Sequence, residues 1–294
     1  MTESNFLECL KAGQRLVADG ATGTNLLTRG LPRGVASEQW VLEKPDEIMR
    51  LEWDFIQAGA QIVLTCTFGA NPFRLNEAGF AERSIEINHR AVELARKAAQ
   101  DLPVFIAGSI GPLGKLLKPY GPILPDEAVS AYMEQAQILT DAGVDLLVIE
   151  TQFDLNEATA AVRAAHAVSD LPLVVSFSYD RGTRTMMGVN PTKMAAALQE
   201  LSVDVLGINC GRSLEDNYKA LLELRQATQL PIWFKPNAGL PEVDEMGNTR
   251  YTLAPNSMAE QTPAWIAAGA SIIGGCCGTT PDHLHAIATA VQGS

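Results

Sequence analysis

The chain has 294 residues, of which 47% are hydrophobic and 19% are charged. This composition excludes disorder of the whole chain, because it supplies enough apolar surface for a sizeable core. A formal net charge of −12, from 22 basic and 34 acidic residues, argues against nucleic acid or an anionic membrane as partner. No apolar run reaches the length of about 18 residues that a membrane-spanning helix needs. Residues 1–10 carry no basic segment of the kind that begins a secretory signal. We therefore expect a cytoplasmic protein with no membrane span and no secretory signal.

The five cysteines are consistent with that location. An odd number, with two of them adjacent, argues against a disulfide framework and for a reducing compartment. We therefore expect free thiols that are available for metal binding or for chemistry. The cysteines are Cys9, Cys66, Cys210, Cys276 and Cys277.

Short apolar runs and segments with helical spacing alternate along the chain. Most of the apolar runs are continuous, which is typical of strands buried on both faces. The predicted strands are residues 16–18, 61–67, 104–109, 144–150, 173–179, 203–210, 232–235 and 270–275. The predicted helices are residues 6–12, 45–58, 81–100, 126–142, 156–169, 191–201, 215–228, 257–268 and 281–292. Gly59, Gly143 and Gly269 each stand between a helix and the next strand, as C-cap glycines do.

Repetition of strand and helix predicts a parallel sheet with helical crossovers. Eight such units in this length fit a closed (β/α)8 TIM barrel best, and a doubly wound open sheet is the alternative, because closure cannot be read from a sequence. No linker or change of composition divides the chain, so we expect a single domain over residues 1–294. Two long segments follow strands, residues 111–125 and residues 237–255, and the second has the character of a small hairpin. Both are expected at the rim of the face where barrels carry their active sites.

Three cysteines lie at the ends of predicted strands on that face. Cys210 ends one strand, while Cys276 and Cys277 end another inside a Gly-Gly-Cys-Cys-Gly segment whose glycines permit a bend. Three converging thiolates suit Zn²⁺, which takes sulfur ligands tetrahedrally and keeps its fourth position open in catalytic sites. Such a centre can bind a substrate thiol as its thiolate, a nucleophile for alkyl transfer. The alternative is that these cysteines are small buried hydrophobic residues.

Five motifs together resemble the homocysteine S-methyltransferase family. They are Asp-Gly-Ala-Thr-Gly-Thr at 19–24, Thr-Cys-Thr-Phe at 65–68, Asn-Cys at 209–210, Pro-Asn-Ala-Gly at 236–239 and Gly-Gly-Cys-Cys-Gly-Thr-Thr-Pro at 274–281. They occur in the family's order over essentially the whole chain, and they most resemble the homocysteine-binding module of the cobalamin-dependent methionine synthase branch. The betaine and S-methylmethionine branches are less similar. The resemblance implies a zinc barrel that activates homocysteine for methylation to methionine.

The resemblance also implies roles for individual residues. It makes Cys210, Cys276 and Cys277 the zinc ligands. It makes Glu150 the acid that meets the substrate ammonium group and Asp19 part of the wall around the substrate, and these two acids are the candidate catalytic residues. The structural alternatives are that Asp19 caps a turn and that Glu150 pairs with an internal base such as Lys235.

Further positions are candidate substrate contacts. Gly20 and Ala21 correspond to the wall beside the substrate amino acid, and Asn237 to a group that can occupy the open zinc position before the thiol arrives. Thr67 and Ser109 lie at strand ends, where hydroxyl groups also often cap helices. Asn237 has the alternative of capping a loop.

One position departs from the family pattern. Cys66 stands where the methionine synthase branch has Asn, and this places a fourth sulfur near the mouth of the predicted barrel. The thiol either approaches the metal or packs against its neighbours. Packing is the more common state of a cysteine at the end of a strand.

The motifs do not identify the methyl donor. No segment resembles a pterin or corrinoid module, so a methylcobalamin donor would have to come from a separate corrinoid protein that docks at the mouth. The alternative is a small sulfonium or quaternary ammonium donor such as S-methylmethionine, betaine or dimethylsulfoniopropionate, for which Trp233 and Phe234 are candidate contacts by position. A different thiol acceptor, a structural zinc barrel and a zinc hydrolase are further alternatives, and the last is disfavoured because no His ends a predicted strand.

Overall fold

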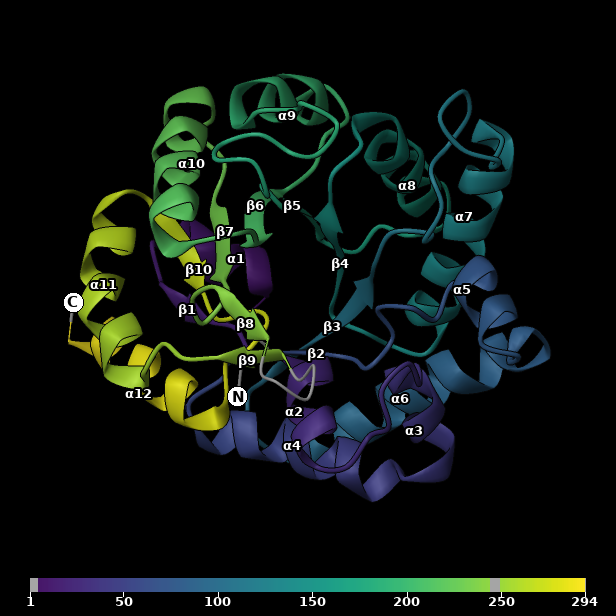
Figure 1. Cartoon of the computed structure of the whole chain (residues 1–294), viewed down its shortest axis with the longest axis horizontal. Coiled ribbons are helices and arrows are strands. Elements are labelled where there is room, and N and C mark those ends of the chain that lie inside the picture. Colours follow the sequence, from purple (N-terminus) through teal and green to yellow (C-terminus); the bar gives the residue numbers. More distant parts are fainter. Residues whose placement is uncertain (1–4, 244–248, 294) are drawn as a thin grey trace.

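The computed structural model describes residues 5–243 and 249–293. Eight parallel strands form one sheet in the order β1-β10-β7-β6-β5-β4-β3-β2, and a parallel bridge between Ala18 and Ile62 joins its two ends. The closed (β/α)8 barrel is therefore confirmed, and the open sheet is wrong because the two end strands pair with each other (Figure 1). The strands are β1 Leu16–Val17, β2 Ile62–Leu64, β3 Phe105–Ile110, β4 Leu146–Gln152, β5 Leu173–Phe177, β6 Val205–Cys210, β7 Ile232–Pro236 and β10 Ala270–Ile273.

Helices surround this ring of strands (Figure 1). All the predicted helices are present, and several begin with a proline in their first turn, as α7 and α12 do. They are α1 Phe6–Lys11, α4 Pro45–Gln57, α6 Ser84–Ala99, α7 Pro125–Asp141, α8 Leu155–Val168, α9 Pro191–Gln199, α10 Leu214–Ala227, α11 Pro255–Ala267 and α12 Pro281–Gln292. None of the helices in the described part of the chain has the length and apolar character needed to cross a membrane.

Sequence periodicity missed several short elements near the barrel mouth. Helices α2 (Thr22–Thr28) and α3 (Ser37–Glu43) follow β1 and α5 (Pro72–Glu77) follows β2, whereas the 3₁₀ turn η1 (Ala81–Arg83) lies within the helix predicted for residues 81–100. Each of the three missed helices spans at most two turns, which is too short for an apolar repeat to be recognised. Their position matters, because together they build one side of the mouth.

The barrel interior is apolar, and so is the end of the barrel at which the strands begin. Side chains from the strands meet in one buried cluster, to which α1 adds Phe6, Cys9 and Leu10. The Phe6 ring packs edge-on against Phe105, with ring centroids 5.7 Å apart. Because Phe105 begins its strand, α1 closes the amino-terminal end of the barrel, and Cys9 is a packing residue at the end opposite to the three-cysteine cluster.

The segment after β7 contains the expected hairpin. Strands β8 (Pro241–Val243) and β9 (Thr249–Tyr251) pair antiparallel, while residues 244–248 lie outside the described part. In Figure 1 the hairpin lies within the ring of helices, close to β10. It therefore overhangs the mouth, on the side opposite to α5.

Two of the helix–strand joints allow a matched test of the fold. Gly59 and Gly143 follow α4 and α7 with φ of 110° and 87°, a region in which a Cβ costs about 1–2 kcal/mol. A Cβ on Gly59 would also lie 2.7 Å from the Ala288 Cβ on α12, whereas one on Gly143 would meet nothing within 4 Å.

We therefore expect Gly143→Ala to lower the free energy of unfolding by about 1–2 kcal/mol and Gly59→Ala to lower it by more. Urea denaturation of the two variants and the wild type measures the difference. Equal losses would show that the contact between α4 and α12 yields without cost.

Candidate metal and substrate site

The three cysteines singled out in the sequence meet at the carboxyl-terminal end of the barrel. The Sγ atoms of Cys210 and Cys277 are 3.9 Å apart, and all three sulfur atoms lie within 4.8 Å of one another. Tetrahedral zinc with Zn–S bonds of 2.3 Å needs sulfur atoms about 3.8 Å apart. The three sulfur atoms therefore have the spacing of a metal site, with room for a fourth ligand.

A pinned turn directs the two adjacent cysteines. The Cys276 N–H donates to the Pro236 carbonyl at 2.8 Å, and the Ala238 N–H donates to the Cys277 carbonyl at 2.9 Å. The Thr279 hydroxyl donates to the Cys276 carbonyl at 2.6 Å. These three bonds hold the turn against the end of β7, so that both sulfur atoms reach the same point although neighbours in a regular strand would diverge.

Asn209 organises the side of the cluster formed by β4, β5 and β6. Its side chain is fully buried, and its Oδ1 accepts from the Thr151 N–H at 2.8 Å and from the Ser176 hydroxyl at 2.7 Å. Its Nδ2 donates to the Thr151 hydroxyl at 2.7 Å and to the Cys276 sulfur at 3.7 Å. Thr151 and Cys210 both have positive φ, 59° and 62°, and strain of this kind persists only where surrounding contacts fix it. Of the two residues in the Asn-Cys motif, only the cysteine was predicted to have a role at the site, and the role of Asn209 was not predicted.

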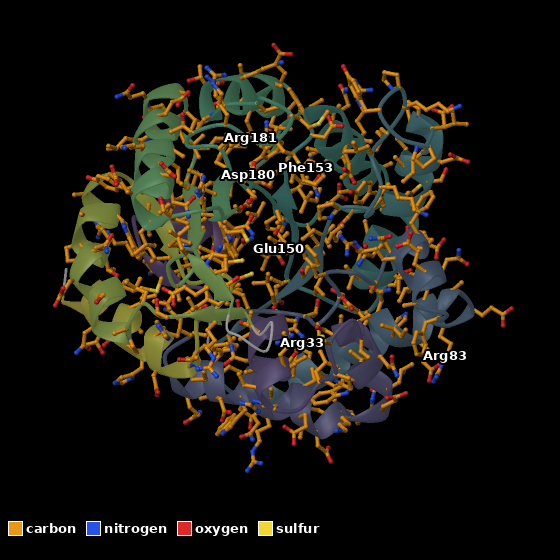
Figure 2. The ribbon with its side chains drawn as sticks, viewed as in Figure 1. Arg33, Arg83, Glu150, Phe153, Asp180 and Arg181 are labelled. Atoms are coloured by element: carbon orange, nitrogen blue, oxygen red, sulfur yellow. The ribbon has the colours of Figure 1, made fainter. Side chains whose placement is uncertain are left out.

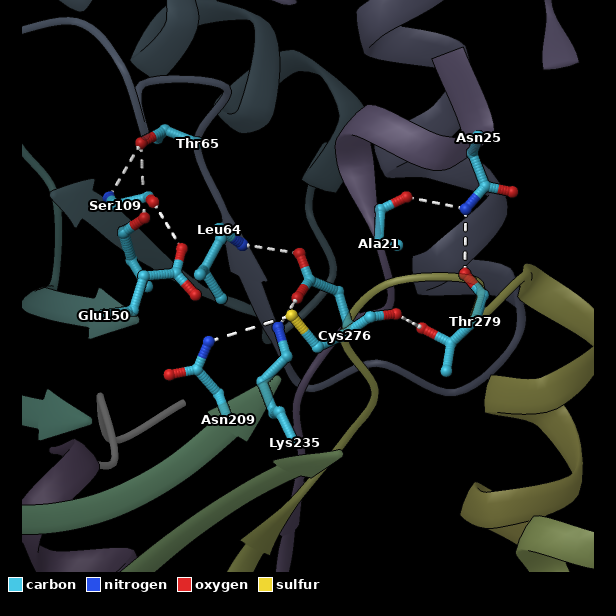
Figure 3. A network of polar contacts seen from close by, with 12 residues as sticks. Ala21, Asn25, Leu64, Thr65, Ser109, Glu150, Asn209, Lys235, Cys276 and Thr279 are labelled. Carbon is cyan, nitrogen blue, oxygen red and sulfur yellow. Dashed lines mark hydrogen bonds and ion pairs between the residues drawn. The ribbon is translucent and has the colours of Figure 1, made fainter. Parts of the chain in front are cut away.

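A buried ion pair joins Lys235, which lines the cavity, to Asp19 behind the cavity wall. Lys235 Nζ is 2.5 Å from Asp19 Oδ1, and the side chains are only 3% and 2% exposed. The second carboxylate oxygen accepts from the Leu64 N–H at 2.8 Å (Figure 3). Burial raises the pKa of Asp19, although Lys235 acts in the opposite direction. Both oxygens of Asp19 are thus engaged within the protein.

Glu150 projects from β4 into the interior of the ring (Figure 2). Its Oε1 accepts from the Ser109 hydroxyl at 2.6 Å. Burial raises the pKa of Glu150 to about 7, against the lowering effect of Lys235. The carboxyl group is therefore poised between its neutral and ionised forms near neutral pH, and a cation that binds beside it will favour ionisation.

A cavity of about 730 Å³ connects these groups. Of the predicted site residues, those on its wall are Gly20, Ala21, Ser109, Glu150, Cys210, Cys276 and Cys277. Asp19, Thr67 and Asn237 are buried behind the wall. The Thr67 hydroxyl donates to the Ser109 carbonyl at 2.7 Å, and Asn237 Nδ2 donates to the Gly211 carbonyl at 2.8 Å. Among the described residues none donates to the buried Oδ1 of Asn237.

The outer half of the cavity is built by α2, α3 and α5, which the sequence did not predict. Glu38, only 5% exposed, lines it and accepts from the Gly69 N–H at 2.5 Å. The Phe68 ring lines it too, with the Arg74 guanidinium 5.5 Å from its centroid. Trp233 and Phe234 are fully buried and outside the cavity wall, so the expectation that they contact a donor is wrong. They point into the barrel interior and toward α11, because neighbouring residues of a strand face opposite sides.

Cys66 and Lys235 complete the wall. Cys66 lines the cavity but is outside the three-cysteine cluster, and burial raises the pKa of its thiol. Lys235 was considered only as a partner for Glu150, whereas its direct contact is Asp19. A single basic residue at the end of an apolar strand did indicate a buried charge at Lys235. Its partner Asp19 could not be identified, because it lies near the opposite end of the chain.

Fold and site define a (β/α)8 barrel with a cluster of three cysteines that could hold a metal ion at its carboxyl-terminal face. A family model described as homocysteine S-methyltransferase matches residues 16–291. The chain belongs to this family of methyl-transferring enzymes, and the resemblance found in its motifs is confirmed.

Individual relatives agree with the family assignment. Methionine synthase from Mycobacterium leprae is 32% identical over 306 residues, which cover 98% of this chain and 25% of that protein. Methionine synthase from Mycobacterium tuberculosis is 31% identical over 293 residues, covering 94% and 24%. The chain thus spans about a quarter of the length of these relatives. The metallated form of the homocysteine methyltransferase MmuM from Escherichia coli is 30% identical and superposes with a TM-score of 0.82 over 96% of this chain and 99% of that one.

The raised pKa of Glu150 predicts a pH-dependent stability. The folded protein binds this proton more tightly than the unfolded chain, whose value is near 4.5. Ionisation of Glu150 therefore lowers the free energy of unfolding as the pH rises from 4.5 to about 7, and the full shift corresponds to a contribution of about 3 kcal/mol from this residue. Glu150→Gln removes that loss, so the free energy of unfolding of the metal-free variant should exceed that of the wild type by up to about 3 kcal/mol at pH 8.

Urea denaturation of both metal-free proteins between pH 4.5 and pH 8 measures this difference. The matched control is Glu134→Gln, which changes an exposed acid on α7 and should show no such trend. A difference between Glu150→Gln and the wild type that stays constant over this pH range would contradict the prediction.

Proposed function

We propose that this chain is a zinc-dependent S-methyltransferase, which ionises homocysteine and methylates it to methionine within a single unit over residues 1–294. The observation that carries the proposal is the meeting of three cysteine sulfur atoms within 4.8 Å on the wall of a cavity that also holds Glu150. Thiolates supply a metal site, and the carboxylate supplies a partner for an amino acid. A purely structural zinc site would have little use for an acid in a cavity of this size.

The donor set favours zinc. Three sulfur ligands at tetrahedral spacing exclude the oxygen-preferring Mg²⁺ and Ca²⁺ and leave one position open. Asn237 Nδ2 donates to the carbonyl of Gly211, the residue after Cys210, and no described residue donates to the buried Oδ1 of Asn237. We propose that this oxygen atom occupies the fourth position on zinc before the substrate thiol binds. When bound, zinc would lower the pKa of a coordinated thiol, so that the thiol loses its proton near neutral pH.

The residues of the chain hold and orient the substrate. Glu150 receives the ammonium group, which keeps the carboxylate ionised although burial raises its pKa. Ser109 fixes the carboxylate through its 2.6 Å hydrogen bond, and the backbone at Gly20 and Ala21 forms the neighbouring wall for the substrate carboxylate. Held at both ends, the substrate presents its sulfur toward the open half of the cavity. The sulfur then attacks the donor methyl carbon in line, and the electron pair of the breaking bond leaves with the donor.

Cobalt replacement tests the metal and the acceptor together. Cobalt should bind at about one ion per chain, and homocysteine should add a sulfur-to-cobalt absorption band. Cys210→Ser, Cys276→Ser and Cys277→Ser should each weaken binding of the metal. Glu150→Gln should retain the metal but lower the affinity for homocysteine by about tenfold to a hundredfold, as expected for loss of a charge-assisted hydrogen bond.

Cys66→Ser is the matched control, because Cys66 lines the same cavity outside the cluster. Retention of the metal by two of the three ligand variants would overturn the site. A sulfur-to-cobalt absorption band that does not change when homocysteine is added would indicate that the metal has a structural role.

For the donor we propose a methylcorrinoid carried by another domain or protein. The similarity to methionine synthases supports this choice, and so do large apolar side chains exposed on three loops of the mouth. Tyr120 follows β3, Met186 follows β5 and Leu240 follows β7, with exposures of 71%, 51% and 49%. A large docked donor would cover such side chains.

A small onium donor is the second candidate, and a separate observation favours it. Glu38 and Phe68 line the outer half of the cavity, and a buried carboxylate with an aromatic face suits a sulfonium or quaternary ammonium group. Such a donor would sit inside the protein rather than on its rim. The two candidates therefore depend on different residues.

Turnover with methylcobalamin, glycine betaine, dimethylsulfoniopropionate and S-methylmethionine separates the candidates. We expect activity with methylcobalamin, reduced at least about tenfold in a Tyr120→Ser/Met186→Ser double variant and little changed by Glu38→Gln. Activity with a small cation alone, abolished by Glu38→Gln and insensitive to the double variant, would replace the corrinoid by the onium donor. Absence of activity with all four methyl donors would contradict both donor proposals.

A further inference from the structure

The ion pair between Lys235 and Asp19 presents its positive member to the cavity. Lys235 lines the cavity, whereas Asp19 is buried behind the wall. Burying two opposite charges usually costs more than their attraction returns, so an apolar pair of the same size would stabilise the barrel as well or better. Packing alone therefore does not account for a lysine after the apolar residues of β7.

The ammonium group of Lys235 has more hydrogen-bond donors than its protein partner uses. It carries three N–H donors, and among the described residues Asp19 Oδ1 is the one acceptor bonded to Nζ. The Trp233 ring centroid lies 5.5 Å from Nζ, but a ring face offers no lone pair. Because the lysine side chain is only 3% exposed, the remaining donors are available mainly to a group that enters the cavity.

Asp19 holds this ammonium group and is itself unavailable to a ligand. Its Oδ1 accepts from Lys235, and its Oδ2 accepts from the Leu64 N–H at 2.8 Å (Figure 3). Glu150 differs, because it lines the cavity and its printed bond, from the Ser109 hydroxyl at 2.6 Å, uses Oε1 alone. The inner part of the cavity therefore offers a ligand one acid, Glu150, and one base, Lys235.

The backbone beside this pair is a weaker carboxylate site than the motif at residues 19–24 indicates. Gly20 and Ala21 line the cavity directly after Asp19 in the chain. The Ala21 N–H, however, donates to the Thr279 carbonyl at 3.2 Å, so one of the two amides expected beside the substrate is occupied. A carboxylate at this wall needs a further donor, which the Lys235 ammonium group supplies together with a positive charge.

Lys235 and Glu150 together match the two charged groups of an amino acid. They come from β7 and β4, which β6 and β5 separate in the ring, and both line the same cavity. The three-cysteine cluster lines that cavity too. A base, an acid and a sulfur-binding cluster thus face one space, and homocysteine carries a carboxylate, an ammonium group and a thiol.

We propose that Lys235 binds the carboxylate of the substrate thiol while Glu150 binds its ammonium group, and that Asp19 is a positioning residue that holds the Lys235 ammonium group toward the cavity. This inference rests on the proposed function and adds a determinant of specificity to it. A site with a buried partner for each charge rejects a thiol that lacks either charge, because the partner is then left unpaired.

Two truncated forms of homocysteine test the assignment. The first, γ-mercaptobutyrate, lacks the ammonium group, and the second, homocysteamine, lacks the carboxylate. Affinities are measured from the sulfur-to-cobalt band of fully loaded protein. Lys235→Met should weaken homocysteine and γ-mercaptobutyrate by about tenfold to a hundredfold, as expected for loss of a charge-assisted hydrogen bond, and should not weaken homocysteamine. Glu150→Gln should show the reverse, with weaker homocysteine and homocysteamine and undiminished binding of γ-mercaptobutyrate.

Two further variants are controls for this comparison. Lys219→Met removes an exposed lysine that pairs with Glu215 on α10 at 2.7 Å, and it should match the wild type with all three thiols. Asp19→Asn/Lys235→Met leaves no carboxylate buried without its partner, so it should fold at least as well as the wild type in urea denaturation and still bind γ-mercaptobutyrate weakly. Calorimetry with methionine and the metal-free proteins should show the same loss on removal of Lys235, independently of the metal.

The outcomes separate this inference from the proposed function. Absence of a thiol band in the wild type with homocysteine would overturn both. A normal band in the wild type, with all three thiols weakened alike in the Lys235 variants, would show that Lys235 has a structural role and overturn this inference alone. Unaltered affinity for γ-mercaptobutyrate in the double variant would do the same.

Discussion

The parallel closure of β1 onto β2 is the constraint on which the rest of the structure depends. The bridge between Ala18 and Ile62 turns an eight-stranded sheet into a ring, and closure brings all strand ends to one mouth. Asp19, which follows β1, thereby meets Leu64 of β2, whose N–H donates to its carboxylate at 2.8 Å. The order of the strands supplies the other contacts, because β10 and then β7 follow β1 in the ring and bring Lys235 to Asp19, and β6 and β10 flank β7 and bring the three cysteines together.

The site concentrates acids and thiols in a place with little water. Three cysteines and Glu150 line one cavity with Lys235, whose ammonium group contacts Asp19, and burial raises the pKa of both acids. Three of these groups have a specific partner, which is Lys235 for Asp19, the Ser109 hydroxyl for Glu150 and the Asn209 amide for Cys276. Binding of a divalent metal and a substrate ammonium group would complete this balance, which is the physical link between the fold and thiol chemistry.

Much of the fold and part of the candidate site were predictable from local patterns. Continuous apolar runs marked the strands of the barrel, prolines and glycines marked the ends of helices, and cysteines at two strand ends marked the three-cysteine cluster. Helices α2 and α3 were not predictable in this way, because each has only seven residues and its apolar face is defined by the barrel it covers. The outer half of the cavity was therefore missed, and Trp233 and Phe234 were considered as donor contacts although they lie outside the cavity wall.

The sequence by itself determined the strand–helix repeat, the family and the three cysteines that form the cluster, because these depend on short-range periodicity and on residue types that few other chemistries use. Only the tertiary structure decided the partners of the buried charges. Lys235 had Glu150 as its expected partner and contacts Asp19 instead, 216 positions away in the chain. Contacts of this kind depend on strand order and register around the closed ring, and no local pattern encodes which of several buried acids will lie nearest to a given base.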